Sequence, residues 1–178
     1  MTTALIVPPG ISLDSLTGQW WVAHTKSRQE KALAGDLARL NVFCFLPVYT
    51  KQTVNRRTGR VFCADVPLFP GYAFINGTRD DREQVLKTNR LARTIEVADP
   101  RRLVHELTQV QRMLVSGAPF SRSGRLRRGD PVRVTRGPLR GVEGVVIHVR
   151  SRWRLVLNVD MLGQSVQVEV EADALERL

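Results

Sequence analysis

The stretch that decides the fold of the C-terminal region is Gly129-Asp130-Pro131-Val132-Arg133-Val134-Thr135-Arg136-Gly137-Pro138-Leu139-Arg140-Gly141-Val142-Glu143-Gly144-Val145-Val146. Apolar and polar residues alternate over 132–135, as in a strand with one buried face, and an apolar face resumes beyond the turn. Gly137, Gly141 and Gly144 can adopt positive φ or bring two backbones close together. The stretch therefore predicts a β-hairpin in which these three glycines are structural.

Strand signals continue from this hairpin to the end of the chain. Short apolar or alternating runs occur at 132–135, 144–149, 153–159, 165–170 and around Ala174-Leu175. Turn residues separate these runs, and the alternation is clearest over 164–170. Five short strands predict an all-β domain over residues 129–178 that closes as a small barrel.

The hairpin resembles the KOW motif of transcription elongation factors and some ribosomal proteins. In that motif a Gly-Asp-x-Val-x-Val strand leads into a Gly-Pro-Leu/Phe-x-Gly-x-x-Gly turn, and residues 129–144 match it nearly completely. The resemblance implies a five-stranded barrel of the Src-homology type. Neither Gly-x-Gly-x-x-Gly nor a Gly-Lys-Ser/Thr phosphate loop occurs, so the glycines do not indicate a nucleotide site.

The N-terminal part mixes helix and strand signals. After a tail over residues 1–18 that we expect to be flexible, the run 20–24 is strand-like. Ser27 and Glu30 have the spacing of a capping box, which predicts a helix starting there. Two later helices are expected, one opening near Asp80 or Asp81 and one from Asp99-Pro100 to Gly117.

A basic hairpin lies between the first and the second of these helices in the sequence. Residues 42–50 and 61–75 are strand-like, and the connection carries Lys51, Arg56, Arg57 and Arg60 around a Thr58-Gly59 turn. With the helices, these strands predict an α+β domain over residues 19–116, built on an antiparallel-rich sheet.

Residues 117–128, GAPFSRSGRLRR, contain four arginines and no acidic residue. Such a composition is typical of a mobile linker. We therefore place the boundary between the α+β domain and the all-β domain there.

A second motif, Leu68-Phe69-Pro70-Gly71-Tyr72-Ala73-Phe74, identifies the kind of KOW protein. It resembles the Phe-Pro-Gly-Tyr signature of the NusG N-terminal (NGN) domain. The resemblance implies a non-enzymatic factor that binds the clamp helices of the largest catalytic subunit of RNA polymerase and suppresses pausing. Phe69 and Tyr72 are our candidates for that contact, because aromatic anchors bury much area at small entropic cost. The alternative is that they pack the sheet, and we expect that role for Phe45 and Phe74.

Within the family, the chain looks more like RfaH and other specialised paralogues than like housekeeping NusG. Residues 160–164, Asp-Met-Leu-Gly-Gln, replace the housekeeping Ile-Phe-Gly-Arg loop. The resemblance implies that Met161, Leu162 and Gln164 of this loop would contact Rho or a ribosomal protein. Two alternatives stay open: the housekeeping factor itself, coupling polymerase to Rho or the ribosome, and an RNA-binding, ribosome-associated KOW protein.

The net charge of +10 gives the chain a field that attracts polyanions. Guanidinium groups contact phosphate bidentately and stack on bases, so an arginine-rich surface suits nucleic acid. The candidate contacts to a non-template DNA strand are Lys26, Arg79, Arg90, Arg56 and Arg57. High genomic G+C content and ordinary surface solvation are the competing explanations.

No catalytic or metal-binding pattern is found in the sequence. The three histidines are scattered, and no His/Cys/carboxylate cluster has the spacing of metal ligands. We expect no cofactor, no metal and no enzymatic activity. Cys44 and Cys63 lie in strand-like surroundings and are expected to be buried free thiols. Without an 18-residue apolar run or a signal peptide, we expect the protein to be cytoplasmic. The resemblance implies a bacterial monomer associated with transcription complexes.

Overall fold

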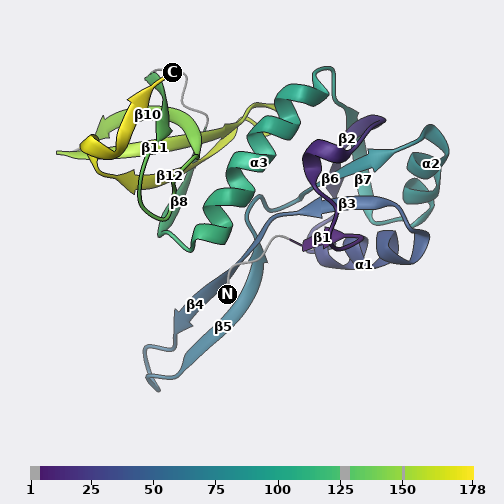
Figure 1. The fold of residues 1–178 in the computed structure, drawn as a ribbon. Coiled ribbons are helices and arrows are strands. Elements are labelled where there is room, and N and C mark those ends of the chain that lie inside the picture. The colour runs from purple at the N-terminus through teal and green to yellow at the C-terminus, as the bar shows by residue number, and fades with distance from the viewer. Residues whose placement is uncertain (1–4, 125–128, 150) are drawn as a thin grey trace. The chain divides into compact units, whose positions relative to one another are not determined.

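The computed structural model describes residues 5–124, 129–149 and 151–178. The chain forms two compact units, residues 1–98 and 99–178, and each is described by itself (Figure 1). The first unit is α+β, and its strands all pair antiparallel. The second consists of one long helix and antiparallel strands.

A five-stranded sheet is the centre of the first unit. Its order is β1-β3-β6-β2-β7. The strands are β1 (Leu5–Val7), β2 (Gln19–Thr25), β3 (Phe43–Leu46), β6 (Tyr72–Gly77) and β7 (Leu91–Glu96). The central strands β2 and β6 pair over six residues, from Gln19 opposite Gly77 to His24 opposite Tyr72.

Two helices, α1 (Glu30–Leu40) and α2 (Arg79–Lys87), cover one face of this sheet. Because side chains alternate along a strand, the same face receives every second residue of β2, β3 and β6. The core on this face consists of Ala23, Leu33, Ala34, Leu37, Val42, Cys44, Leu46, Val48, Ala73, Ile75, Val85 and Leu91.

The helix starts differ from the sequence expectation at α1 and α2. Its N-cap is Gln29, which makes no side-chain capping bond, so the capping box predicted at Ser27 and Glu30 is wrong. The Glu30 carboxylate is instead bonded outside the helix, as described below. In α2 the N-cap is Thr78 and not the expected Asp80 or Asp81, and Asp81 completes a capping box with Thr78.

The segment expected to be a flexible tail is partly ordered in the structure. Strand β1 pairs with β3 along the sheet edge, and a short 3-10 helix, η1 (Leu13–Ser15), follows it. Leu13 is buried. The physical reason is that an edge strand exposes backbone donors and acceptors, which the apolar run 5–7 satisfies by pairing.

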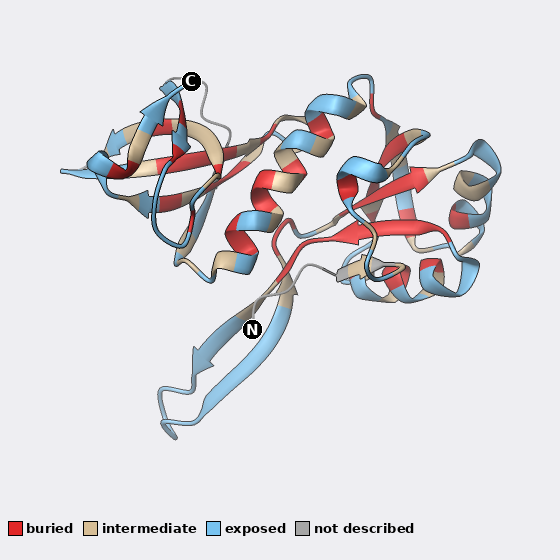
Figure 2. Ribbon diagram, viewed as in Figure 1, coloured by how far each residue is buried: buried red, intermediate tan, exposed pale blue. Residues whose placement is uncertain are grey.

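Among the described strands, β4 (Val48–Val54) and β5 (Val61–Pro67) pair only with each other. They form the predicted basic hairpin, here called the arm, which extends from the first unit in Figure 1. Figure 2 shows it as almost wholly exposed. Cys44 is buried as expected, but Cys63 lies in the arm and is exposed, contrary to expectation. A two-stranded ribbon has no second layer that could cover either face.

In the second unit, α3 (Pro100–Ser116) begins at the N-cap Asp99, whose carboxylate accepts from the N–H of Arg102 at 3.1 Å. It ends at Gly117, where φ is +69°. Both ends match the sequence expectation. The strands are β8 (Phe120–Gly124), β9 (Asp130–Val134), β10 (Glu143–Val149), β11 (Arg152–Val159), β12 (Gln164–Val170) and β13 (Leu175–Arg177). Two 3-10 turns, η2 (Asp160–Leu162) and η3 (Ala172–Ala174), connect them.

Part of the expected linker 117–128 is a strand. Within the six-stranded sheet, whose order is β13-β9-β10-β11-β12-β8, strand β8 pairs with the edge of β12 from Phe120 to Gly124. The composition of this segment is compatible with strand pairing. The hydrogen bonds between strands are made by backbone N–H and C=O groups, and small polar side chains leave these groups accessible. Residues 125–128 lie outside the described residues.

The hairpin predicted over residues 129–146 is formed by β9 and β10. Gly137 and Gly141 have φ of +80° and +82° at its corner, which an L side chain rarely adopts. Gly144 is different: a Cβ there would lie 2.6 Å from the carbonyl oxygen of Val156, so close approach of β11 excludes a side chain.

Candidate functional site

The Phe-Pro-Gly-Tyr turn precedes β6 and is fixed from two sides. The N–H of Gly71 donates to Glu30 Oε1 on α1 at 2.7 Å, and its carbonyl accepts from the N–H of Thr25 on β2 at 2.9 Å. Gly71 has a φ of +83°. The N–H of Tyr72 closes the turn onto the carbonyl of Phe69 at 3.2 Å. Helix α1 and strand β2 together therefore determine where this turn lies.

Tyr72 directly follows the turn, and its ring stacks on the ring of His24. The rings of His24 and Tyr72 are 5.0 Å apart at their centroids, with an angle of 25° between their planes. Both side chains are half-buried. Phe69, by contrast, is 1% exposed, so it presents no surface in this conformation. Of the two aromatic candidates from the sequence, Tyr72 alone can be reached by a partner in this conformation.

The stacked pair ends an aromatic row on the sheet face opposite α1 and α2. Pairing of β2, β3 and β6 aligns these side chains on that face. Trp20 and Phe43 meet edge to face at 5.7 Å, and Phe45 and Phe74 are tilted at 6.2 Å. Phe45 and Phe74 are fully buried, as expected for core residues.

Lys26 and Arg90, two of the predicted DNA contacts, lie next to each other. The N–H of Lys26 donates to the carbonyl of Arg90 at 2.8 Å, and Lys26 Nζ donates to Asn89 Oδ1 at 2.6 Å. Arg90 Nη1 donates to Gln29 Oε1 at 2.6 Å, and its Nε is paired with the Asp36 carboxylate. Arg90 is thus held by groups of its own chain, while Lys26 is exposed.

The bond from Arg90 lowers the pKa of Asp36 below its ordinary value of 3.8. Burial acts in the opposite direction, and charge interactions with Arg90 and Arg39 act in the same direction as the bond. This makes Asp36 and Arg90 a fixed ion pair at neutral pH.

The other predicted DNA contacts lie elsewhere in the first unit. Arg79 is the first residue of α2, roughly 12 Å along the axis from its last residue, so it stands apart from the turn at Arg90. Arg56 and Arg57 occupy the exposed tip of the arm. The structure therefore brings Lys26 close to Arg90, places Arg56 and Arg57 together at the arm tip, and leaves Arg79 at the start of α2.

The predicted partner-binding loop of the second unit is tied to α3. The N–H of Asp160 donates to Glu106 Oε2 at 3.0 Å, and the Asp160 carboxylate is paired with Arg102. Met161, Leu162 and Gln164 follow and are half-buried. The same helix contacts the hairpin of β9 and β10, since Gln109 Oε1 accepts from the N–H of Glu143 at 2.9 Å.

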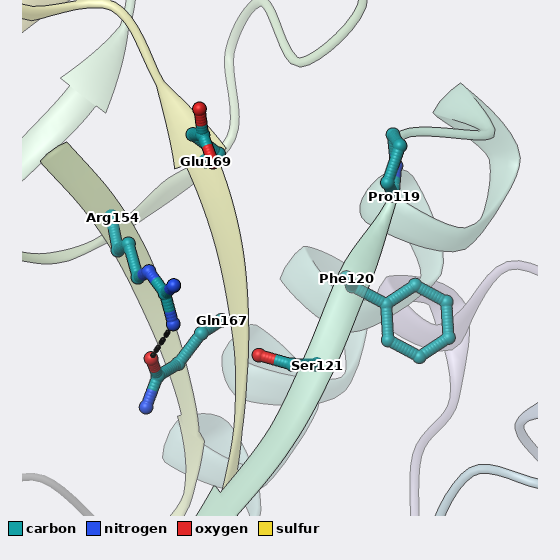
Figure 3. Close-up of a pocket in the computed structure, with 6 residues that line it drawn as sticks. All are labelled: Pro119, Phe120, Ser121, Arg154, Gln167 and Glu169. Atoms are coloured by element: carbon teal, nitrogen blue, oxygen red, sulfur yellow. Dashed lines mark hydrogen bonds between the residues drawn. The ribbon is translucent and has the colours of Figure 1, made fainter. Parts of the chain in front are cut away.

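Two of the hollows on the described strands of the second unit are lined by no residue of α3. The larger, about 350 Å³, is at the hairpin corner and is lined by Val134, Arg136, Gly137, Pro138, Leu139, Glu169, Val170, Glu171 and Ala174. Figure 3 shows the smaller, about 170 Å³, lined by Pro119, Phe120, Ser121, Arg154, Gln167 and Glu169. In it, Arg154 Nη1 donates to Gln167 Oε1 at 3.3 Å. In neither hollow is a described nucleophilic side chain hydrogen-bonded to a general base, as a catalytic site would require.

Within the described residues, no three His, Cys, Asp or Glu side chains are grouped so as to hold a metal ion. In the same residues, no helix is both long and apolar enough to cross a membrane.

Comparison with known proteins identifies the family. The family model "NusG: Transcription termination factor nusG" matches residues 18–117, more than half of the chain. The chain belongs to the NusG family. It is also 25% identical over 174 residues to the "Transcription termination/antitermination protein NusG" of Rickettsia typhi, across 89% of this chain and 90% of that protein. NusG-family proteins are non-enzymatic transcription factors, and membership implies binding to RNA polymerase.

Sequence reasoning does not identify three residues of the candidate site. His24 stacks on Tyr72, Glu30 anchors Gly71, and Asp36 holds Arg90. The spacing of Glu30 from Ser27 predicts a capping bond within the helix. It does not predict the partner that Glu30 has in the structure, which lies 41 residues away. The other two pairs join separate elements, and no local pattern reports such contacts.

Proposed function

We propose that this protein is a specialised NusG-family factor that binds the clamp helices of the largest catalytic RNA polymerase subunit and suppresses pausing or termination. The observation that carries the proposal is the stacked His24–Tyr72 pair beside the anchored Gly71 turn. It is a rigid, partly exposed aromatic edge, and aromatic side chains held in place lose little entropy on binding.

Tyr72 is the contact residue in this proposal, and Phe69 supports the turn from beneath. The burial of Phe69 favours that division of roles, since a side chain that is 1% exposed stabilises its surroundings before any partner arrives. Lys26 contacts the phosphates of the non-template strand, with Arg79 adding a second basic group at the start of α2. Arg90 contributes through its bonds to Asp36 and Gln29, which hold the segment next to Lys26.

In the same proposal, the strands of the second unit close as a KOW barrel that recruits a further partner. Met161, Leu162 and Gln164 form the recruiting surface, because a half-buried apolar pair beside a polar residue can dock without unfolding. The bonds from Asp160 to α3 hold this loop in place.

The second candidate function is that of the housekeeping factor, which couples polymerase to Rho or the ribosome. It is favoured by the relative from Rickettsia typhi, which is named for both termination and antitermination and matches this chain along most of its length. The loop sequence at 160–164 favours the specialised factor instead.

Single-round transcription with purified RNA polymerase separates the two candidates. On a template that carries a pause site followed by a Rho-dependent terminator, the specialised factor shortens the pause and leaves or lowers Rho termination. Stimulation of Rho termination, abolished by changing Met161 and Leu162 to Ser, would establish the housekeeping function. No effect on elongation, together with no binding to polymerase, would refute both.

A further inference from the structure

The arm concentrates positive charge at its tip. Residues 48–67 contain four basic side chains, Lys51, Arg56, Arg57 and Arg60, and one acidic residue, Asp65. Asp65 lies toward the base of the arm, opposite Thr50, whose hydroxyl donates to Asp65 Oδ1 at 2.7 Å. The tip therefore has no carboxylate within residues 51–64 to balance its charge.

An ordered turn presents this charge. Asn55 Oδ1 accepts from the N–H of Arg57 at 2.9 Å and from the N–H of Thr58 at 3.2 Å. The N–H of Asn55 donates to the carbonyl of Arg60 at 2.9 Å. An Asx turn of this kind fixes the backbone while leaving the arginine side chains exposed.

An exposed aromatic ring lies directly behind the turn. Phe62 is 56% exposed and pairs across the arm with Thr53. The next pair on the same face is Lys51 opposite Ala64. Since its neighbours on this face are a small residue, a threonine and a lysine, much of the ring stays open to solvent. Val61, the adjacent residue, points to the opposite face and is 58% exposed.

We propose that the tip of the arm binds an unpaired nucleic-acid strand, with the Phe62 ring as a stacking platform for a base and the arginines as phosphate contacts. The inference rests on the proposed function in one respect, because a transcription factor works where strands are unpaired. The combination of a cationic turn and an uncovered ring matches a polyanion that carries flat apolar faces. A duplex offers the same phosphates but keeps its bases stacked, so it cannot use Phe62.

Fluorescence anisotropy of the full chain tests this with labelled oligodeoxythymidine, the matching oligoribonucleotide and a duplex, in the absence of RNA polymerase. Phe62→Ala is expected to weaken binding to an unpaired strand about tenfold and to leave duplex binding unchanged. Phe62→Trp should restore it. Val61→Ala is the matched control, since it removes an equally exposed apolar side chain from the other face. Comparing the DNA and RNA strands identifies which of them depends on Phe62.

A salt titration tests the arginines separately. Changing Arg56 and Arg57 to Gln should flatten the slope of log K against log salt by about 0.7 for each phosphate that the variant no longer neutralises. Equal affinities of Phe62→Ala and Val61→Ala for every strand would overturn the proposal and leave the tip as a surface for a protein partner. That result would not affect polymerase binding, which is measured independently.

Discussion

Glu30 on α1 accepts a 2.7 Å hydrogen bond from the backbone N–H of Gly71, 41 residues further along the chain. The Glu30 side chain lies among buried residues, at 7% exposure. A buried carboxylate needs such a donor, because leaving it unbonded costs more than the bond itself contributes. This bond therefore joins the first helix to the turn that precedes Tyr72.

Glu30→Ala is expected to lower the free energy of unfolding by about 2 kcal/mol, since it leaves the N–H of Gly71 unbonded. Glu30→Gln keeps an acceptor and should cost roughly half as much. Urea unfolding measures both. Glu83→Ala, on the exposed surface of α2, is the control and should stay within about 0.5 kcal/mol. If Glu30→Ala were as stable as this control, the bond would have no structural role.

Gly71→Ala should destabilise the protein by about 1–2 kcal/mol because its φ of +83° strains an L side chain. Steric crowding adds little, since the new Cβ would lie 3.7 Å from the His24 ring. Gly35→Ala in α1 meets open space and should stabilise by about 0.5–1 kcal/mol. The midpoint temperatures of thermal unfolding of the two variants should shift in opposite directions from that of the wild type. A shift of the same sign in both would contradict the assigned role of Gly71 in the turn.

The two cysteines should differ sharply in reactivity. Burial raises the pKa of the Cys44 thiol to about 12, so almost none of it is thiolate at neutral pH, whereas Cys63 is exposed on the arm. Ellman's reagent should modify one thiol quickly in the folded protein and the second only in denaturant. Cys63→Ser should remove the fast reaction, and a fast reaction that survives in this variant would place Cys44 at the surface.

The Asp36–Arg90 pair predicts a pH-dependent contribution to stability. The pKa of Asp36 is lowered in the folded state, so the ion pair stabilises fully above the unfolded value of 3.8 and is lost as the pH falls through the folded value. Asp36→Asn should be less stable than wild type at neutral pH, and the difference should shrink as the pH falls from about 5 toward 2. Asp14→Asn, on an exposed turn, controls for net charge. A difference that stays constant with pH would mean that Asp36 acts through packing alone.

Much of the fold could be predicted from the sequence because its signals are local. The glycines of the 129–146 hairpin, Asp99-Pro100 and Gly117 each act within a few residues, and the elements that they mark are present. The alternating runs after residue 130 likewise correspond to strands β9 to β13.

The remaining features depend on contacts between distant segments. Strand β1 forms because β3 offers an edge, and β8 forms because β12 does. The apolar run of β1 is only three residues long, and β8 consists mostly of small or polar residues. The exposure of Cys63 follows from the lack of a second layer over the two-stranded arm, which the apolar pattern of residues 61–75 does not reveal. In the candidate site, the sequence indicated Tyr72, but its stacking on His24 and the burial of Phe69 depend on the assembled sheet.

The most direct test of the central proposal is the affinity of the full chain for core RNA polymerase, measured for wild type, Tyr72→Ala and Tyr49→Ala. Tyr49, the other tyrosine of the chain, lies in β4 outside the main sheet and is the matched control. The proposal predicts tight binding by wild type and Tyr49→Ala, and an affinity loss of about thirtyfold, or about 2 kcal/mol, for Tyr72→Ala. Equal binding by Tyr72→Ala and Tyr49→Ala, or no binding by the wild type, would contradict it.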